Sequence, residues 1–291
     1  MLSFDHYPFF QPDPDGRFGN ISKAGFVANL ATVRRAALGA SIPFWVAIRV
    51  VPIPFGVVGG VVTQYDPSEA QLRWQAFTAL AYGAKGIIYF TCESRITHPS
   101  PCLLVKRRLT LLSLYACWTV GGADWAMGTF DGAGMVEMKG NTSNHAPGPH
   151  YFQAQRINSV LRVFGTLLLN ATSTGVHRMQ SGDDAAAKLV GCAVSNVTMR
   201  QGCLGGACVA WSLVIGQFRL PDARTALLIV NQDDRHTVVP SFNDTAIKAW
   251  QEVDGNTGAE ATVESDAPQL RGLALALAPG QGRLLLAGGD A

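Results

Sequence analysis

The stretch GAKGIIYF, residues 83–90, decides the fold that the sequence predicts. A run of helical character leads directly into it, and its second half, GIIYF, is apolar throughout. A strand this apolar must bury both of its faces. Strands that alternate with helices and are apolar on both faces are typical of a parallel sheet covered by helices, so we expect an α/β fold here.

The helix before this strand is predicted within DPSEAQLRWQAFTALAYGAKG, residues 66–86, which contains both its start and its stop signals. Asp66 is expected as its N-cap, with Pro67 at the first helical position and Glu69 as the acid of a capping box. Gly83 lies where the helix should end. These start and stop signals occur together, which makes this the clearest helix in the chain.

Two further strands are predicted upstream. MLSFDHY, residues 1–7, is expected as a buried strand, and PFWVAIRVV, residues 43–51, as a second one. A helix over about 23–38, capped by Ser22, should connect them. The segment PIPFGVVGGVVTQY, residues 52–65, is interpreted as a glycine-rich loop.

Polar side chains follow all three predicted strands. In parallel sheets and barrels, ligands bind at the carboxyl ends of the strands, so these residues should lie at one end of the sheet. The candidate binding residues are therefore Asp5, His6, Tyr7, Arg49, Thr91, Cys92 and Glu93.

The character of the sequence changes at about residue 175. Residues 94–147 are interpreted as an insertion, and helical spacing resumes over 151–168. From 176 onward, short apolar or alternating runs are separated by turn residues, as in an antiparallel β-sandwich. We therefore expect one domain over 1–175 and a second, all-β domain over 176–291.

Composition and motifs exclude several functional classes. Only 15% of the residues are charged and the net charge is +2, so nucleic acid is not an expected partner. The longest apolar run, residues 109–120, is too short to span a bilayer, so no membrane partner is expected either. No phosphate-binding, dinucleotide-binding or serine-nucleophile motif occurs, and the histidines are scattered. Neither a cofactor nor a metal is expected.

Cysteines and glycosylation sequons bear on the compartment. Cys203 and Cys208, in CLGGAC, have the spacing of a small disulfide-closed loop. Five Asn-x-Ser/Thr sequons begin at Asn20, Asn141, Asn170, Asn196 and Asn243. Together they favour a secreted or secretory-pathway protein, although the N-terminal residues lack the pattern of a signal peptide.

Several segments together resemble one enzyme family. SFDHYPFF, PFWVAIRV, SEAQLRWQAFTALAYGAKGIIYFT, HYFQAQRINSVLRVFG and the closing LALALAPGQGRLLLAG look like the C-terminal half of a β-galactosidase-like glycoside hydrolase, and residues 73–91 are the most specific piece. Such enzymes join a (β/α)₈ barrel to a small β-sandwich. The resemblance implies that residues 1–175 are a partial TIM barrel holding its last three strands. Either the chain is a fragment, or a second chain supplies the missing strands.

The resemblance also implies roles for the polar residues. Glycosidases of this kind use two carboxylates, about 5–5.5 Å apart in retaining enzymes. The acid/base would follow the fourth barrel strand, which is missing. The nucleophile would end the seventh, where Arg49 stands and cannot attack a sugar. Glu93 is the candidate catalytic acid, and Asp5, His6, Tyr7 and Arg49 are the candidate sugar-binding residues.

Two functions are compatible with this pattern. The first is a glycoside hydrolase that cleaves O-glycosidic bonds when its barrel is complete. The second is a non-catalytic carbohydrate-binding or structural remnant of such an enzyme, which the missing acids favour. In both cases the expected ligand is a carbohydrate. The sequence leaves open which sugar and anomer are recognised, and whether the reaction retains or inverts.

Overall fold

The chain forms two compact units. The computed structural model describes residues 1–9, 22–50, 53–57, 60–64, 66–90, 136–138, 145–147, 149–181, 183, 188–194, 197–199, 203–204, 207–208, 211–242, 250–268 and 272–287. The first unit consists of Met1–Leu72 and Ala84–Asn158, and the second of Arg73–Gly83 and Ser159–Ala291.

Helices and strands are mixed before residue 91, whereas every element that begins after residue 170 is a strand among the residues that the structure describes. The elements up to Leu168 are β1 (Leu2–Asp5), α1 (Lys23–Gly39), β2 (Phe44–Arg49), β3 (Ile53–Val57), β4 (Gly60–Gln64), α2 (Glu69–Ala81), β5 (Gly86–Phe90), β6 (Val136–Met138), β7 (His145–Pro147) and α3 (Pro149–Leu168). The later ones are β8 (Thr172–Gln180), β9 (Val197–Met199), β10 (Cys203–Leu204), β11 (Ala207–Cys208), β12 (Ser212–Arg219), β13 (Thr225–Asn231), β14 (Pro240–Phe242), β15 (Trp250–Val253), β16 (Glu260–Thr262), β17 (Leu273–Ala274) and β18 (Gly282–Ala287).

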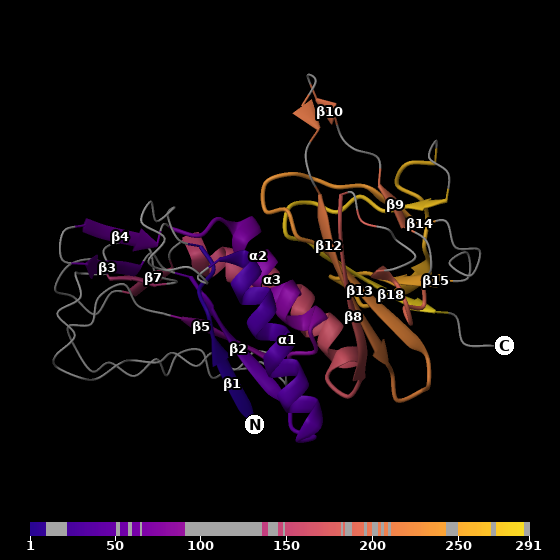
Figure 1. Cartoon of the computed structure of the whole chain (residues 1–291), viewed down its shortest axis with the longest axis horizontal. Coiled ribbons are helices and arrows are strands. Elements are labelled where there is room, and N and C mark those ends of the chain that lie inside the picture. Colours follow the sequence, from indigo (N-terminus) through magenta and orange to yellow (C-terminus); the bar gives the residue numbers. More distant parts are fainter. Residues whose placement is uncertain are drawn as a thin grey trace. The chain divides into compact units, whose positions relative to one another are not determined.

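A parallel three-stranded sheet forms the centre of the first unit (Figure 1). Its strand order is β1-β2-β5, and both pairings are parallel. The predicted order of strand, helix, strand, helix, strand holds for these three strands and the helices between them, but the structure adds β3 and β4 between β2 and α2. Helix α1 packs on this sheet through Phe26, whose ring centroid lies 6.3 Å from that of Phe4.

The two faces of this sheet differ in burial. On one face Val46, Ile48 and Ile87 are fully buried, whereas on the other Trp45 and Ile88 are only half-buried. Burial of both faces was expected, and for β1 this expectation is wrong. Its Leu2 and Phe4 are half-buried, and Ser3 and Asp5 are exposed, because β1 is an edge strand that α1 covers on one side.

Helix α1 begins as predicted. Ser22 caps it, and its Oγ accepts a hydrogen bond from the Gly25 amide at 3.1 Å. Helix α2 begins two residues later than expected, because Ser68 and not Asp66 is its N-cap. The Gln71 amide donates to Ser68 Oγ at 3.3 Å, and the Ser68 amide donates to Gln71 Oε1 at 3.0 Å, which is a reciprocal capping box.

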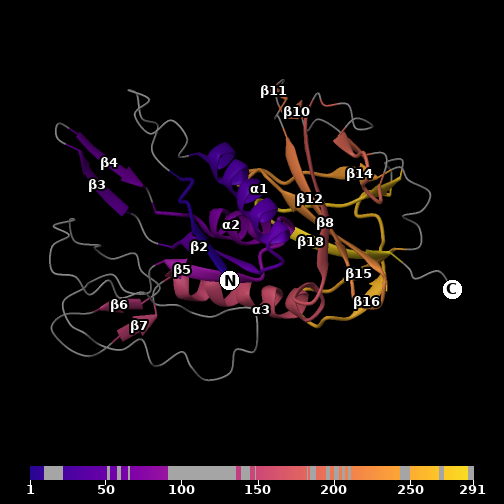
Figure 2. The ribbon, with the colours of Figure 1, turned by 60° about the horizontal axis from the view of Figure 1, so that its bottom comes forward.

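The glycine-rich segment between β2 and α2 is a β-hairpin and not the predicted loop (Figure 2). Strands β3 and β4 pair antiparallel from Ile53↔Gln64 to Val57↔Gly60, so two residues connect them. Apolar runs on both sides of the pair Gly59-Gly60 are a hairpin signal, because glycine readily adopts the positive φ that a two-residue turn needs. Within the insertion expected at 94–147, β6 and β7 also pair antiparallel.

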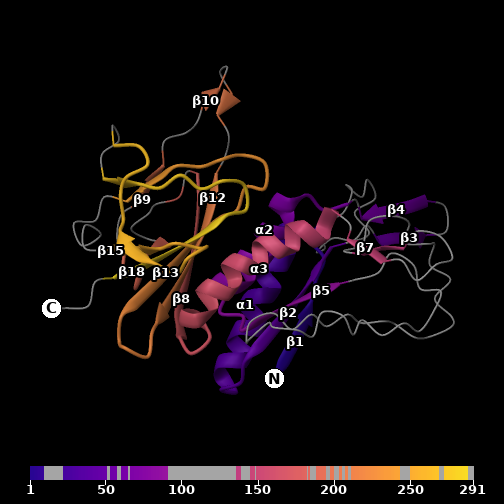
Figure 3. The same cartoon turned by 180° about the vertical axis from the view of Figure 1, so that it is seen from behind.

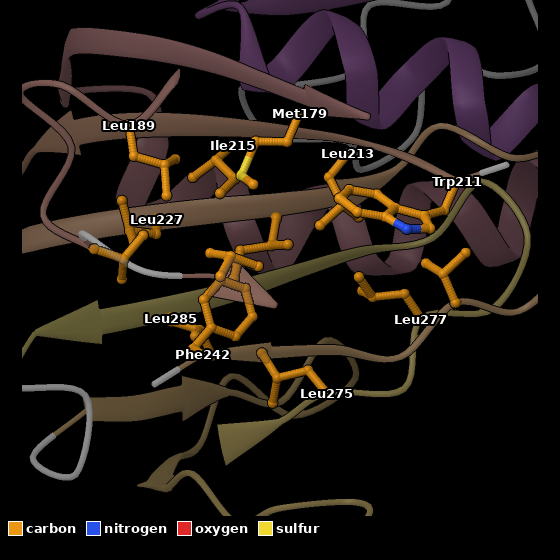
Figure 4. Packing of buried hydrophobic residues seen from close by; sticks show 14 of the residues in the cluster. Met179, Leu189, Trp211, Leu213, Ile215, Leu227, Phe242, Leu275, Leu277 and Leu285 are labelled. Atoms are coloured by element: carbon orange, nitrogen blue, oxygen red, sulfur yellow. The ribbon is translucent and has the colours of Figure 1, made fainter. Parts of the chain in front are cut away.

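Two antiparallel sheets form the main body of the second unit (Figure 3), and β10 and β11 pair antiparallel as a separate two-stranded sheet. The larger has the strand order β16-β15-β18-β13-β12-β8, and the smaller has the order β17-β14-β9. One hydrophobic cluster draws side chains from both sheets, among them Leu213, Leu227 and Leu285 from the larger and Phe242 from the smaller (Figure 4). This cluster is the core of the second unit.

The larger sheet is buried on its other face as well. Val214, Phe218, Leu228 and Leu284 point away from the cluster and are at most 1% exposed. The part of α2 that belongs to this unit packs on that face: a Cβ added to Gly216 would lie 2.3 Å from the carbonyl oxygen of Ala81, and one added to Gly282 would lie 2.9 Å from the Phe77 ring. The segments of α2 and α3 that belong to this unit were expected in the first domain. Burial on both faces explains why β13 is apolar from Ala226 to Val230.

Candidate functional site

The parallel pairing brings the predicted polar strand ends to one edge of the first unit's sheet. Asp5 pairs with Ala47, which pairs with Ile88 on its other side. Two residues further along both strands, Arg49 pairs with Phe90. We call this edge the carboxyl edge; it comprises Asp5–Tyr7, Arg49–Val50 and Tyr89–Phe90. Glu93, the predicted catalytic acid, and its neighbours Thr91 and Cys92 lie outside the described residues.

Tyr7 connects the first strand to the last across the carboxyl edge. Its ring stacks on that of Phe90, with centroids 5.5 Å apart and planes inclined by 22°. Burial raises the pKa of the Tyr7 phenol above its usual range; the negative charge of Asp5 raises this pKa further, and the positive charge of Arg49 opposes the rise. Tyr7 is therefore a neutral hydrogen-bond donor at every physiological pH, and it shares its environment with Asp5 and Arg49.

Arg49 is the most buried of the candidate residues. It ends β2 and is 0% exposed. Its positive charge opposes the rise in the pKa of Tyr7 and also opposes the rise in the pKa of His150, so the guanidinium interacts electrostatically with both groups. A guanidinium carries five donors in a fixed plane and holds its charge at all relevant pH values, which suits the recognition of hydroxyl or carboxylate oxygens.

The structure adds an ion pair that the sequence pattern does not single out. His150 Nε2 lies 2.8 Å from Asp66 Oδ1, and His150 Nδ1 lies 2.6 Å from Gln153 Oε1. Both ring nitrogens thus lie within hydrogen-bond distance of a side-chain oxygen, and His150 donates to both of them when its imidazole is protonated. The His150 side chain is 5% exposed and that of Asp66 is 55% exposed, so the pair reaches from the interior to the surface.

The pKa of His150 is raised although the side chain is buried. Burial lowers the pKa of the imidazole, but the hydrogen bonds to Asp66 and Gln153 and the charge of Asp66 outweigh this effect and the opposing charge of Arg49, so the pKa of His150 is raised. Asp66 precedes α2, and His150 is the second residue of α3. Helices that follow parallel strands begin near the carboxyl edge, and this rule could have directed attention to both residues.

His6 lies apart from Asp5 and Tyr7, although the three are consecutive. Asn29 Nδ2 donates to His6 Nδ1 at 2.9 Å, and the His6 ring lies 5.8 Å from that of Phe26, so His6 faces α1. Burial lowers the pKa of His6, against smaller opposing effects of the Ser22 backbone and of Asp5. Successive side chains of a strand point to opposite faces, which separates His6 from its two neighbours.

Behind the carboxyl edge, a buried hydrogen bond joins β5 to α3. The Tyr89 hydroxyl donates to Asn158 Oδ1 at 2.8 Å, and both residues are buried. Beside it, the guanidinium of Arg156 binds both carboxylate oxygens of Glu69, with Nε–Oε1 and Nη2–Oε2 distances of 3.0 and 2.8 Å. The beginnings of α2 and α3 are thus linked twice, by Asp66–His150 and by Glu69–Arg156.

Searches for relatives and for other kinds of site give little. Among the described residues, no group of three or more His, Cys, Asp or Glu side chains could hold a metal ion. No helix in the described parts of the chain has the length and apolarity needed to cross a membrane. No protein-family model and no curated protein matches the sequence. The function is therefore inferred from the geometry of the carboxyl edge and from the resemblance of its sequence segments.

Proposed function

We propose that the first unit is one arc of a glycoside-hydrolase-like (β/α) barrel and that its carboxyl edge binds a carbohydrate. In a completed barrel the protein would act on O-glycosidic bonds. The observation that carries the proposal is the meeting of Asp5, Tyr7 and Arg49 at the carboxyl ends of neighbouring parallel strands. A carboxylate, a neutral phenol and a guanidinium together supply acceptors and donors for sugar hydroxyls.

The strand order supports a barrel over a doubly wound sheet. The order β1-β2-β5 advances in one direction without a reversal. Right-handed crossovers that advance in one direction place their helices on the same face, and a closed barrel protects the opposite face. That opposite face carries half-buried Trp45 and Ile88 and exposed Asp5. In this proposal the remaining strands, from the same protein or a second chain, cover those residues.

The chemistry at the end of β2 favours a second candidate function, which is carbohydrate binding without catalysis. A retaining glycosidase needs a nucleophilic carboxylate and a second carboxyl group about 5–5.5 Å away. The residue that ends β2 is Arg49, which is permanently charged and cannot form a glycosyl-enzyme bond. Glu93 is the remaining candidate acid, so hydrolysis by the present chain depends on it.

Saccharide binding to the full chain tests the proposal. We expect a glycan array to retain the wild-type chain on at least one class of oligosaccharide, and Tyr7→Phe and Arg49→Gln to reduce the signal at least tenfold. Arg35→Gln is the matched control, because Arg35 is exposed on α1. Binding that is absent in the wild type, or that survives both substitutions in folded protein, would contradict the proposal.

An aryl β-glycoside assay on the same preparations separates the two candidate functions. Release of the aryl group by the wild-type chain, and its loss in Glu93→Gln, would favour the hydrolase. Saccharide binding without any release would favour the non-catalytic reading. Circular dichroism of each variant establishes that the protein is folded, so that loss of binding is not a loss of structure.

A further inference from the structure

The chain is unusually rich in N-glycosylation sequons. It contains ten asparagines and 33 serines and threonines among 291 residues, so chance would place about one asparagine in an Asn-x-Ser/Thr sequence. Five of the ten are in such sequences, and none has proline at the middle position. This excess points to modification, but it does not say which asparagine is accessible.

Asn170 has the geometry that an acceptor requires. It lies in the bend between α3 and β8 and is exposed, and Thr172, the hydroxyl residue of its sequon, is exposed as the first residue of β8. Between them, Ala171 is 5% exposed, and its amide donates to the Leu168 carbonyl at 3.3 Å. The buried alanine anchors the turn, so that both polar side chains of the sequon face solvent.

Asparagines that support the fold are outside sequons. Asn158 is buried and accepts the Tyr89 hydroxyl. Asn231 is buried too, and its amide nitrogen donates to the carbonyl oxygens of His236 and Leu277 at 2.8 and 3.1 Å. A glycan could not be accommodated at either position, whereas at Asn170 it would extend into solvent.

We propose that Asn170 is an N-glycosylation site and that this chain matures in a compartment with an oligosaccharyl transferase. The donor is an oligosaccharide carried on a lipid diphosphate. The side-chain nitrogen of Asn170 forms a bond to the anomeric carbon, and the bond from that carbon to the diphosphate oxygen breaks. The lipid diphosphate leaves with the electron pair, and the amide gives up one proton to a base of the transferase.

The test is translation of the full chain, behind a cleavable signal peptide, in the presence of endoplasmic-reticulum microsomes. We expect one glycan-sized mobility step to disappear in Asn170→Gln and in Thr172→Ala, and to remain in Thr172→Ser, which preserves the sequon hydroxyl. Asn256→Gln is the matched control, because Asn256 is exposed but begins the sequence Asn-Thr-Gly, which is not a sequon.

Peptide mass spectrometry then identifies the modified residue. After enzymatic deglycosylation in heavy-oxygen water, the peptide containing Asn170 should carry labelled aspartate at that position in the wild type and in Thr172→Ser. An unmodified Asn170 in protease-protected, luminal chain overturns the proposal, whether or not another sequon is occupied. This readout does not depend on saccharide binding by the carboxyl edge, so it stands or fails separately from the proposed function.

Discussion

The roles of individual residues at and near the carboxyl edge follow from the side chains that they contact. Asp66 has the sequence signature of a helix cap, yet its carboxylate accepts a hydrogen bond from His150, 84 positions away in the chain. Asp5 and Tyr7 could be placed at a strand end from the sequence, because polar residues follow a short apolar run there. The contacts of His6 with α1 and of His150 with Asp66 join segments that are distant in the chain, and a single sequence does not reveal such contacts.

The Asp66–His150 pair makes part of the stability depend on pH. Because folding raises the pKa of His150 above its ordinary value of 6.5, the pair contributes fully below that pH, and its contribution is lost as the pH rises through the raised pKa. We expect His150→Gln to reduce the free energy of unfolding by about 1–3 kcal/mol at pH 5 and by less above neutrality. Urea denaturation over pH 5 to 9 measures this difference.

His236→Gln is the control for that series, because His236 pairs with Asp233 at the surface and its side chain is 53% exposed. It should cost less than His150→Gln at pH 5. An NMR titration of the His150 ring provides a second readout, with a midpoint above 6.5. A midpoint below 6.5, or a His150→Gln effect on stability that grows with pH, would contradict a raised pKa of His150.

The buried hydrogen bond between Tyr89 and Asn158 gives a second prediction at this scale. Tyr89→Phe keeps the ring but removes the donor to Asn158 Oδ1, and should destabilise the protein by about 1–3 kcal/mol. Tyr151→Phe, at a half-buried position on the same helix as Asn158, should change stability by less than about 0.5 kcal/mol. Equal effects of the two substitutions, measured by urea denaturation, would argue against the bond.

At the scale of elements, start signals and turn residues were informative when they agreed with periodicity. Ser22 was identified as a cap because an apolar periodic run follows it. For α2, three polar residues compete for the cap within Asp66–Glu69, and the reciprocal bonds of Ser68 and Gln71 decide between them. Glycine content alone does not separate a loop from a hairpin turn, so the segment predicted as a glycine-rich loop differs from the observed β3–β4 hairpin.

The position of the cap can be tested directly. Ser68→Ala should destabilise α2 and reduce the free energy of unfolding by about 1 kcal/mol, because it removes the acceptor of the Gln71 amide. Ser68→Thr keeps a hydroxyl acceptor and should cost less. Asp66→Asn, in contrast, should weaken the contact with His150 without removing the cap. A greater loss of helical circular dichroism in Asp66→Asn than in Ser68→Ala would favour Asp66 as the cap.

Close packing of α2 on β12 explains one glycine in the second unit. Gly216→Ala would place a Cβ 2.3 Å from the Ala81 carbonyl oxygen, which is backbone and cannot move aside, so we expect a loss of about 1–3 kcal/mol or more. Gly39→Ala in α1 is the control, because nothing lies within 4 Å of its added Cβ. It should stabilise the protein by about 0.5–1 kcal/mol.

Thermal unfolding of both glycine variants provides the comparison. The melting temperature should fall in Gly216→Ala and rise slightly in Gly39→Ala. If Gly216→Ala unfolds at the wild-type temperature, the contact between α2 and β12 within the second unit is not as close as described.

At the scale of the whole molecule, the succession of a helix-alternating part and an antiparallel part could be predicted from strand length, apolar runs and turn spacing. The membership of α2 and α3 in both compact units could not. Helix α2 is buried nearly all round, including Gln75 and Thr78, so its periodicity does not identify the face that meets each neighbour. The face of α2 that packs on the second unit's sheet is identified only by contacts in the structure, such as the hydrogen bond from Gln232 to Thr78, 154 residues apart in the chain.

The most direct test of the central claim is an NMR titration of the labelled full chain with the oligosaccharide it retains best on the array. We expect amide shifts to concentrate at residues 5–7, 49–50 and 89–90, the carboxyl ends of β1, β2 and β5. Shifts at the opposite strand ends, near Leu2, Phe44 and Gly86, or confined to the second unit's sheets, or no shifts at all, would contradict a carbohydrate site at the carboxyl edge.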